Sequence, residues 1–132
     1  MDRSRAVVRV RLQRRRDTGQ WALSMGKMEI GETPSQCAVR ETEEETGIIV
    51  EPVSMLGVYS DPGHIVAYTD GEVRQEYEVM LIARPAGGQP RANDEASDVR
   101  WVAPEELQSL DIHPTQWRQL NDYLSGAYPH ID

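Results

Sequence analysis

The sequence has few features that would place the chain outside the cell or in a membrane. Its single cysteine, Cys37, cannot form an internal disulfide, so a reducing compartment is expected. No segment approaches the roughly 18 consecutive apolar residues that a membrane-spanning helix requires. The basic N-terminal stretch lacks the apolar block and the small-residue cleavage site of a secretory signal. We therefore expect a cytoplasmic protein with no membrane partner.

The chain is also poor in positive charge, with 14 Lys and Arg against 22 Asp and Glu and a net charge of −8. Broad nucleic-acid binding depends on Lys and Arg that neutralise phosphates, so no nucleic-acid partner is expected. A small phosphate-bearing ligand is compatible with this charge, because a metal and a few placed cations can hold it locally. Seven arginines lie in the first sixteen residues. They are interpreted either as a solvated strand face and turn or, for one or two of them, as phosphate-facing.

The length and composition fit one ordinary globular domain. The chain has 132 residues, of which 39% are hydrophobic and 27% charged. This length is enough to bury a core, and the composition is neither disordered nor fibrous. There is no internal repeat, no low-complexity tract and no linker. A single domain spanning residues 1–132 is therefore expected.

Several segments have the spacing or the composition of strands. Apolar and polar residues alternate over Ala6–Gln13, as in a half-buried strand. Four further strands are expected from their β-branched and aromatic residues: Ile48–Tyr59, Ile65–Tyr68, Tyr77–Arg84 and Val99–Val102. Turns are expected at residues 17–20, Pro62-Gly63, Asp70-Gly71 and Gly87-Gly88.

The clearest helix signal lies between Thr33 and Gly47. Thr33 is a good N-cap, Pro34 suits the first helical position, and Gln36 completes a Thr-x-x-Gln capping box. Gly47 stands where a C-terminal glycine cap belongs. A helix over residues 34–46 is therefore expected.

Two shorter helices are expected near the C-terminus. One begins at Pro104 and runs toward Leu110, and the other begins at Pro114. The second helix would carry apolar residues on one face, namely Trp117, Leu120 and Leu124. Strands interleaved with few helices predict an α/β fold, with a mixed sheet packed between helices.

The expected helix 34–46 has an unusual acidic face. Glu41, Glu44 and Glu45 project from one side, because residues three and four apart are neighbours on a helix, whereas Glu43 points the other way. Repulsion among these carboxylates, near the negative end of the helix dipole, costs on the order of 1 kcal/mol. One interpretation is a merely solvated acidic face. The other is a divalent-cation site, because convergent carboxylates suit Mg²⁺ or Mn²⁺.

The residues around this face resemble a known motif. Gly26-Lys27-Met28-Glu29-Ile30-Gly31-Glu32, then seven residues, then Arg40-Glu41-Thr42-Glu43-Glu44-Glu45-Thr46-Gly47-Ile48, is similar to the Nudix box G-x5-E-x7-R-E-U-x-E-E-x-G-U, where U is a bulky aliphatic residue. Every charged and glycine position is present, and only Thr42 departs from an aliphatic position. The resemblance to small bacterial Nudix hydrolases extends over about Leu12–His113.

This resemblance implies an α/β/α sandwich with a central mixed β-sheet. The N-terminus is short beside such relatives, so the first strand is expected to be truncated, replaced or supplied by a partner copy, which leaves a homodimer open. Ser24 and Met25 stand where relatives usually have Pro and Gly. The loop before Lys27 is therefore expected to differ from theirs in shape or rigidity.

The resemblance also implies an activity. Family members hydrolyse the pyrophosphate bond of a nucleoside diphosphate linked to another moiety, with Mg²⁺, or Mn²⁺ as the alternative, as cofactor. The substrate would be ADP-ribose, a nucleotide sugar or a similar compound. The first alternative is a nucleoside-triphosphate pyrophosphohydrolase that cleans the nucleotide pool. A non-catalytic nucleotide-binding sensor is the second, although no carboxylate of the motif is missing.

Roles for individual residues follow from the same resemblance. Glu44 and Glu45 would be the principal metal ligands, and Glu41 would be either a ligand or the base that acts on water. The backbone carbonyl of Gly26 would complete the metal shell, because glycine allows a close approach. Arg40 would orient the Glu41 carboxylate through a charge-assisted hydrogen bond.

Three further positions surround this set. Lys27 matches a position whose cation steadies charge on a phosphoryl group, and Glu32 is interpreted as structural, holding the loop to the helix. Glu95, outside the motif, matches a position where relatives place an additional metal ligand or general base. Its competitors for that role are Asp94, Asp98 and Glu78.

Aromatic residues and histidines outside the motif are the candidates for substrate contacts. Trp21 and Tyr59 would stack on a nucleobase, with core packing as the alternative for both. His64 follows a turn that borders the pocket in relatives, so it is a third candidate. His113 and His130 are expected to have structural or solvent-exposed roles.

Overall fold

The computed structural model describes residues 10–132, and of His64 only the backbone. Its first sheet has the strand order β2-β1-β5, with β1 at Val10–Arg15, β2 at Trp21–Ala22 and β5 at Ala96–Val102. Both pairings in this sheet are antiparallel. The expected first strand began at Ala6. Its residues before Val10 lie outside the described part of the chain.

The second sheet has the order β4-β3-β6, with β3 at Ile48–Ala67, β4 at Val73–Gly88 and β6 at His130–Ile131. β3 pairs antiparallel with β4 and parallel with β6, so this sheet is mixed. The expected mixed β-structure is therefore confirmed, but it is divided between two sheets.

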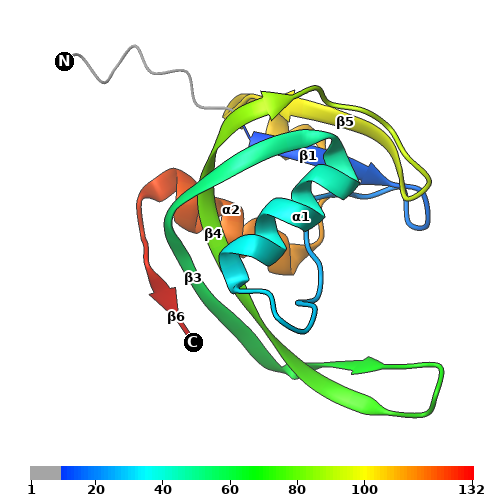
Figure 1. Cartoon of the computed structure of the whole chain (residues 1–132). Helices are drawn as coiled ribbons and strands as arrows, with labels where there is room; N and C mark the ends of the chain where they lie inside the picture. Colours follow the sequence, from blue (N-terminus) through cyan, green and yellow to red (C-terminus); the bar gives the residue numbers. More distant parts are fainter. Residues whose placement is uncertain (1–9) are drawn as a thin grey trace.

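Three helical segments accompany the sheets: α1 at Pro34–Thr46, a 3₁₀ helix η2 at Pro104–Ser109, and α2 at Pro114–Ser125. Figure 1 shows α1 in the hollow of the curved strands, with α2 behind it. The bounds of α1 are those expected from its caps. None of the helices within residues 10–132 is both long and apolar enough to cross a membrane.

The main core lies between the first sheet and the C-terminal helices. Val10 and Leu12 of β1 pack there with Leu107 of η2 and Leu120 of α2. Leu124, expected on the same face of α2, is 38% exposed instead, because it lies one turn beyond the packed part of the helix.

The opposite face of β1 is covered as well. Gln13 is buried like its neighbour Leu12, so the expectation of a half-buried strand is wrong in this part of the chain. Arg11 also projects from this face, and its electrostatic interaction with Glu45 shows that the face is turned toward α1. Helices on both faces give the expected α/β/α arrangement.

The β3–β4 hairpin differs most from expectation. Pro62-Gly63 was expected to be a turn between two strands, but β3 continues through it and pairs with β4 on both sides. The pairing register shifts between Ser60 and Ile65, and such an irregularity accommodates a proline that cannot donate to the ladder. The reversal occurs at Asp70-Gly71, as expected, where Gly71 has φ +86°. The resulting hairpin extends from the body (Figure 1).

Gly87-Gly88 was also expected to form a turn, and the structure places it at the end of β4, paired with Ile49 and Ile48. Gly88 has φ +77°, and a Cβ there would lie 2.2 Å from the carbonyl oxygen of Gly47. Gly88 therefore allows β4 to pass close to the end of α1.

Candidate active site

Helix α1 is fixed at both ends by contacts from its own sequence. The Thr33 hydroxyl accepts from the backbone N–H of Gln36 at 3.1 Å, and the Gln36 side chain accepts from the backbone N–H of Thr33 at 2.9 Å. At the other end Gly47 has φ +78°, and its N–H donates to the carbonyl of Glu43. These caps fix where the acidic side chains leave the helix.

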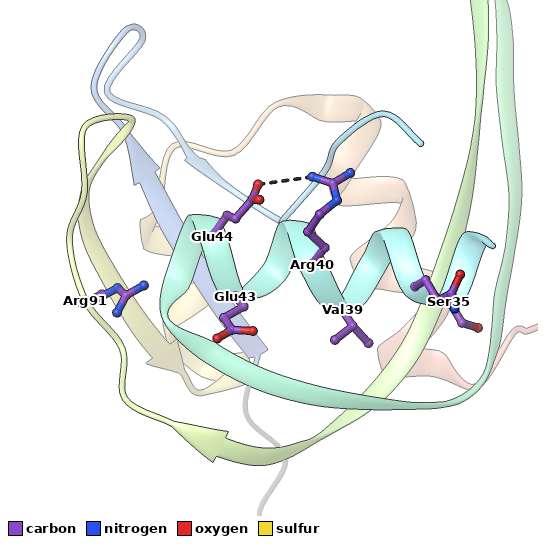
Figure 2. A pocket seen from close by; sticks show the side chains of 7 residues that line it. Ser35, Val39, Arg40, Glu43, Glu44 and Arg91 are labelled. Atoms are coloured by element: carbon purple, nitrogen blue, oxygen red, sulfur yellow. Dashed lines mark hydrogen bonds and ion pairs between the residues drawn. The ribbon is translucent and has the colours of Figure 1, made fainter. Parts of the chain in front are cut away.

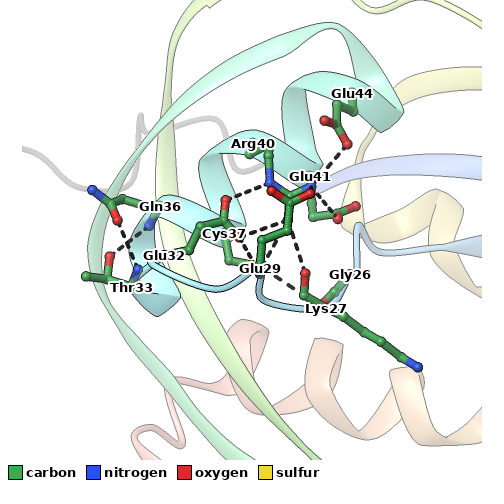
Figure 3. Close-up of polar contacts among 10 residues, drawn as sticks. All are labelled: Gly26, Lys27, Glu29, Glu32, Thr33, Gln36, Cys37, Arg40, Glu41 and Glu44. Atoms are coloured by element: carbon green, nitrogen blue, oxygen red, sulfur yellow. Dashed lines mark hydrogen bonds and ion pairs between the residues drawn. The ribbon is translucent and has the colours of Figure 1, made fainter.

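Arg40 is the centre of a network of carboxylates (Figure 3). Its Nε and Nη2 donate to the two oxygens of Glu32 at 2.6 and 2.9 Å. Its Nη1 donates to Glu41 at 2.7 Å and to Glu44 at 3.2 Å. Nη2 also donates to the backbone carbonyl of Lys27 at 3.1 Å. One guanidinium thus joins the loop before α1 to two carboxylates of its acidic face.

Glu32 is held in a single orientation by this network. The hydrogen bonds from Arg40, and then that from the backbone N–H of Glu29, lower its pKa to about 2. Both oxygens of Glu32 are therefore occupied within the protein. This geometry fits the structural interpretation of Glu32.

Gly26 approaches Glu41 so closely that no side chain fits between them. A Cβ at Gly26 would lie 2.1 Å from the carboxyl carbon of Glu41. The carbonyl oxygen of Gly26 lies 4.0 Å from the Sγ of Cys37 on the same helix. The loop backbone therefore lies directly against the acidic face of α1.

Glu45 is the least satisfied carboxylate of the acidic face. Burial, followed by the charges of Glu41 and Glu95, raises the pKa of Glu45 to about 7, against hydrogen bonds from the Met25 backbone and the Ser24 hydroxyl. Its Oε2 is buried and accepts no hydrogen bond from the described residues. A buried carboxylate oxygen without a donor, beside two other acids, is suited to a hard divalent cation.

The acidic side chains are not gathered around one point. Within residues 10–132, His64 excepted, no group of three or more Asp, Glu, His or Cys side chains is spaced to hold a metal. Glu41 and Glu44 share Arg40, whereas Glu45 turns to the side of Ser24. The side chain of Glu44 is 60% exposed, so it can turn toward Glu45 without leaving a buried partner.

Glu95 comes close to this face through the loop before β5. The side chain of Asn93 accepts from the backbone N–H of Glu95 at 2.9 Å and donates to the carbonyl of Glu45. The charge of Glu95 consequently acts on Glu45. Its competitor Asp98 is paired with Arg100 at 2.7 Å.

A hollow of about 580 Å³ lies on the surface of α1 (Figure 2). Ser35, Val39 and Glu43 project to one side of the helix there, and Arg40 and Glu44 to the other. Neither Gly26 nor Glu45 lines this hollow. It lies beside the acidic face and contains only part of the expected ligand set.

A larger cleft of about 840 Å³ is formed by β1, β3, β4, β5, α1, α2 and the loop before α1. Gly26, Lys27, Glu41 and Arg11 line it, together with many apolar side chains. This size lies within the roughly 300–1,000 Å³ of small-molecule sites. The cleft is therefore large enough for a nucleotide, and it reaches the acidic face of α1 at Glu41.

Arg11 is a cation inside this cleft. Its Nη2 donates to the Ser24 hydroxyl at 3.1 Å, and its Nε is buried without a partner among the described residues. Burial lowers its pKa, and the charge of Glu45 opposes that shift. By contrast, Arg14 donates to the carbonyl of Gly19 at the turn. Arg11 and Arg14 lie three residues apart on β1, so their side chains project from opposite faces of the strand.

Lys27 is held by the β3–β4 hairpin. Its Nζ lies 4.3 Å from the centre of the Tyr68 ring and donates to the Tyr68 hydroxyl at 3.0 Å. Figure 3 shows the side chain of Lys27 leading away from Arg40. The spacing of the motif gives no sign of Tyr68, because the two residues are brought together only by the fold.

Trp21 and Tyr59 are placed in the interior. Trp21 is 6% exposed, and the Arg100 guanidinium lies 4.8 Å from its ring. Tyr59 is 5% exposed, stacks on His130 at 4.7 Å, and donates its hydroxyl to Asp122 at 2.8 Å. Neither lines the large cleft. The geometry thus fits the core-packing alternative, and stacking on a base has no support in it.

The three histidines have separate positions. The side chain of His64 lies outside what the structure describes, so its predicted substrate contact stays a prediction. The ring of His113 caps α2 by accepting from the backbone N–H of Thr115 at 3.2 Å. His130 lies beside Tyr59 and contacts Asp132 at 2.8 Å. The last two have structural contacts.

Two further polar residues of the cleft were not predicted as a site from the sequence. Gln119 of α2 is buried, with 2% of its surface exposed, and donates to Glu78 of β4 at 2.7 Å. Glu78 was considered only as a competitor of Glu95. No motif marks Gln119, because its contact joins residues far apart in the chain.

Known families provide a context for this site. The family model described as the NUDIX domain matches residues 2–123. The chain belongs to the Nudix hydrolase family. It is 36% identical over 118 residues to the "MutT-like protein" of Streptomyces ambofaciens, covering 89% of this chain and 70% of that protein. It is 32% identical over 117 residues to the "Putative 8-oxo-dGTP diphosphatase" of Bacillus subtilis, covering 88% and 71%.

A solved structure shares the fold of this chain. A UDP-X diphosphatase superposes with a TM-score of 0.71 at 22% identity, covering 93% of this chain and 60% of that protein. The Nudix fold expected from the sequence is therefore confirmed. This Nudix hydrolase is an enzyme that acts on phosphoric anhydride bonds of nucleotide-derived compounds, in a family that generally uses a divalent cation.

Proposed function

We propose that this Nudix hydrolase uses Mg²⁺, with Mn²⁺ as the alternative, to cleave the pyrophosphate bond of a nucleoside diphosphate linked to another moiety. ADP-ribose and nucleotide sugars belong to this class. The observation that carries the proposal is the Glu45 carboxylate, whose buried Oε2 has no partner among the described residues beside the charges of Glu41 and Glu95. A cation would offset the burial and the repulsion that together raise the pKa of Glu45.

The ligand set is proposed from the residues around that oxygen. Glu44 and Glu45 would hold the metal, with the carbonyl of Gly26 and the carboxylates of Glu41 and Glu95 completing its shell. The close approach of Gly26 to Glu41 supports this set, because a Cβ there would occupy the space between them. When bound, the metal supplies charge neutralisation on the phosphates and an acidified water.

The remaining roles belong to side chains of the same region. Arg40 holds Glu41 in place, at 2.7 Å. Either Glu41 or Glu95 takes the proton of the attacking water. Lys27 and Arg11, both in the large cleft, would bind the phosphate oxygens and stabilise charge on the departing phosphate group. The bond broken is the one between the bridging oxygen and the attacked phosphorus.

A second candidate is hydrolysis of a nucleoside triphosphate to a monophosphate and pyrophosphate. The name of the Bacillus subtilis relative favours it. The size of the cleft, about 840 Å³, favours the first candidate, because it leaves room for a moiety beyond the nucleotide. A non-catalytic sensor is the least favoured, since all of the motif carboxylates are present.

Product analysis separates these candidates. The protein is incubated with Mg²⁺ and a panel of nucleotide sugars, ADP-ribose and nucleoside triphosphates, and the products are separated by chromatography. A nucleoside monophosphate plus a sugar phosphate is the expected result. A monophosphate plus pyrophosphate would instead support the triphosphate reaction.

Variants of the acidic face test whether the site is catalytic. The double variant Glu44→Gln, Glu45→Gln is expected to lose roughly 10³-fold in kcat/KM. Glu43→Gln is the matched control on the same helix and is expected to retain activity, because Glu43 points away from this face. Equally low turnover in the wild type and the double variant would contradict an enzymatic role and support a sensor.

We also propose that the protein is cytoplasmic. The one cysteine, Cys37, is buried and unpaired, and burial raises the pKa of its thiol, as suits an unreactive thiol in a reducing cytoplasm. Whether two copies associate is tested by sedimentation, with a monomer or a homodimer as the two outcomes.

A further inference from the structure

The β3–β4 hairpin contacts the loop before α1 through the side chain of Lys27. The Nζ of Lys27 donates to the Tyr68 hydroxyl at 3.0 Å and lies 4.3 Å from the centre of the Tyr68 ring. The carboxylate of Glu76 lies 4.0 Å from the same Nζ and accepts from the Tyr68 hydroxyl. The ammonium therefore has a hydroxyl, a ring face and a carboxylate as partners, and all three belong to the hairpin.

The reversal of the hairpin lies away from the body of the molecule (Figure 1). Within it, the N–H of Tyr68 donates to the carbonyl of Glu72 at 2.8 Å, and Glu72 pairs with Arg74. The guanidinium of Arg74 lies 4.4 Å from the Tyr68 ring. These contacts stay inside the hairpin, so the contact with Lys27 is the one that connects its reversal to the loop before α1.

Lys27 is fixed at its backbone and mobile along its side chain. Its carbonyl accepts from the Nη2 of Arg40 at 3.1 Å, so its backbone belongs to the network on α1. Its side chain is 69% exposed and leads away from Arg40 (Figure 3). A long exposed side chain on a fixed backbone exchanges one anionic partner for another readily, because water screens each pair and only side-chain torsions change.

Glu76 has the relation to Lys27 that a phosphate of a ligand would have. Carboxylate and phosphate are both oxyanions that accept from an ammonium group. Lys27 and Glu76 both line the large cleft, so a phosphate that reaches Lys27 there finds Glu76 already beside it. The side chain of Glu76 is 41% exposed, and water can solvate its carboxylate once Lys27 has left.

We propose that Tyr68 and Glu76 are positioning residues that act on the reaction through Lys27. They hold its ammonium in a resting position, from which the phosphate of a ligand withdraws it. Glu76 is then an internal competitor of the substrate, and the reversal of the hairpin is freed from the loop when a ligand binds. This inference rests on the proposed function in that Lys27 binds a phosphate oxygen.

Binding of a nucleotide that is not cleaved tests the competition. α,β-Methylene-ADP has a carbon in place of the bridging oxygen, and it is titrated by calorimetry in the presence of Mg²⁺. Glu76→Gln is expected to bind it about 3-fold more tightly than the wild type, because an exposed ion pair contributes a factor of this order. Tyr68→Phe keeps the ring but loses the hydrogen bond to Lys27, so its affinity should change in the same direction.

Glu72→Gln is the matched control for these titrations. It removes one negative charge from the same hairpin, but Glu72 pairs with Arg74 and not with Lys27. It is therefore expected to bind the analogue as the wild type does. Equal affinities of the wild type and Glu76→Gln, or an equal gain in Glu72→Gln, would overturn the proposal.

Lys27→Met separates competition from general repulsion between Glu76 and the ligand. In the Lys27→Met background, Glu76→Gln is expected to change the affinity little, because the contested ammonium is absent. A 3-fold gain that persists in this background, at roughly the size expected of an exposed pair, would assign the effect to repulsion and overturn the proposal. Unweakened binding by Lys27→Met alone would overturn it too, since Lys27 would then not bind the ligand.

Hydrogen exchange shows whether the hairpin is freed. The amide N–H of Tyr68 is bonded within the reversal, and its exchange is followed with and without the analogue. Exchange in the wild type is expected to become about 3-fold faster when the analogue binds, and exchange in Lys27→Met should be the same with and without it. Exchange that responds neither to the analogue nor to Lys27→Met would overturn the release of the hairpin.

Turnover keeps this inference apart from the proposed function. If a pyrophosphate bond is cleaved, Glu76→Gln should lower KM about 3-fold and leave kcat unchanged. If no compound of the panel is hydrolysed and the affinities for the analogue change as expected, the positioning of Lys27 stands and the proposed function fails. If a compound is hydrolysed and neither KM nor the affinity responds to Glu76→Gln, the proposed function stands and the positioning fails.

Discussion

The segment from Gly26 to Gly47 and the large cleft beside it are built in different ways. In the segment, contacts are local: Thr33 pairs with Gln36, and Arg40 binds carboxylates within eleven residues of itself. In the cleft, contacts join distant parts of the chain, as in the pair of Gln119 with Glu78. Local contacts leave a readable spacing in the sequence, and distant ones do not.

This difference separates two tasks of the enzyme. The segment holds the groups that we propose to act on the phosphoric anhydride, and their geometry depends on one helix and one loop. The cleft would bind the rest of the nucleotide, and its geometry depends on several strands, two helices and a loop meeting. Substitutions in the segment should therefore change turnover most, whereas substitutions in the cleft should change affinity most.

Among single substitutions, the largest effect is expected from Gly26→Ala. The added Cβ would lie 2.1 Å from the Glu41 carboxyl carbon, so either the loop or the carboxylate must move. We expect kcat/KM to fall roughly 10²-fold, as for a displacement of about 1 Å at a reacting group. Gly63→Ala is the control, because its Cβ would meet only the side chain of Asp61, at 3.2 Å. Retained activity in Gly26→Ala would mean that this close approach is not needed.

Arg40→Lys is expected to have the next largest effect. A lysine cannot bind Glu32 through two parallel hydrogen bonds and hold Glu41 at the same time. Loss of such a positioning contact is expected to lower kcat/KM about 10- to 100-fold, with a higher Mg²⁺ requirement. Arg91→Lys, at the outer hollow, is the control and should behave as wild type. An unchanged Mg²⁺ dependence would remove the positioning role.

Arg11→Gln tests whether the large cleft contributes to substrate affinity. If Arg11 binds a phosphate oxygen, its loss should raise KM about 10-fold and change kcat less. Arg14→Gln, on the same strand but at the solvent-exposed turn, should leave both constants unchanged. A fall in kcat at constant KM would place Arg11 in the chemistry of the segment instead and would weaken the division between segment and cleft.

The smallest effect is expected from Glu45→Gln on the melting temperature of the metal-free protein. The pKa of Glu45 is raised from 4.5 to about 7 by folding, so its contribution is fully present below about 4.5 and is lost as pH rises through 7. In EDTA at pH 8, Glu45→Gln should therefore melt about 2–4 °C above the wild type. At pH 5 the two proteins should melt at the same temperature, and Glu43→Gln should melt like the wild type at both values of pH. An equal difference in melting temperature at pH 8 and pH 5 would contradict the raised pKa of Glu45.

Much of the fold was predictable, and the exceptions have physical causes. The caps Thr33 and Gly47 fixed the bounds of α1, since capping is a local interaction. The turn predicted at Pro62-Gly63 was wrong, because β3 pairs with β4 both before and after these residues, which form an irregularity within one strand and not a reversal between two. The exposure predicted for Gln13 was also wrong: it is buried, on the face of β1 from which Arg11 interacts with Glu45 of α1, and tertiary packing of this kind is not visible in the alternation of one strand.

In the candidate site, too, the residues in local contact were predictable and those in tertiary contact were not. The spacing of the motif located Gly26, Arg40 and the three carboxylates of the acidic face, but not how those carboxylates share one guanidinium. Aromatic character singled out Trp21 and Tyr59, which the structure buries. Gln119 carried no signal in one sequence, because its partner lies 41 residues away on another element. Residues that depend on tertiary contacts need the fold before they can be found.

Binding of a divalent cation by Glu45 and its neighbours is the property on which the proposed chemistry depends. Mn²⁺ binding, followed by its electron paramagnetic resonance signal, tests that property without any substrate. The wild type and Glu43→Gln are expected to bind Mn²⁺ with the same affinity, and Glu45→Gln is expected to bind at least about 10-fold more weakly. Equal binding by the wild type and Glu45→Gln, or equal weakening by Glu43→Gln, would contradict a cation site on this face of α1.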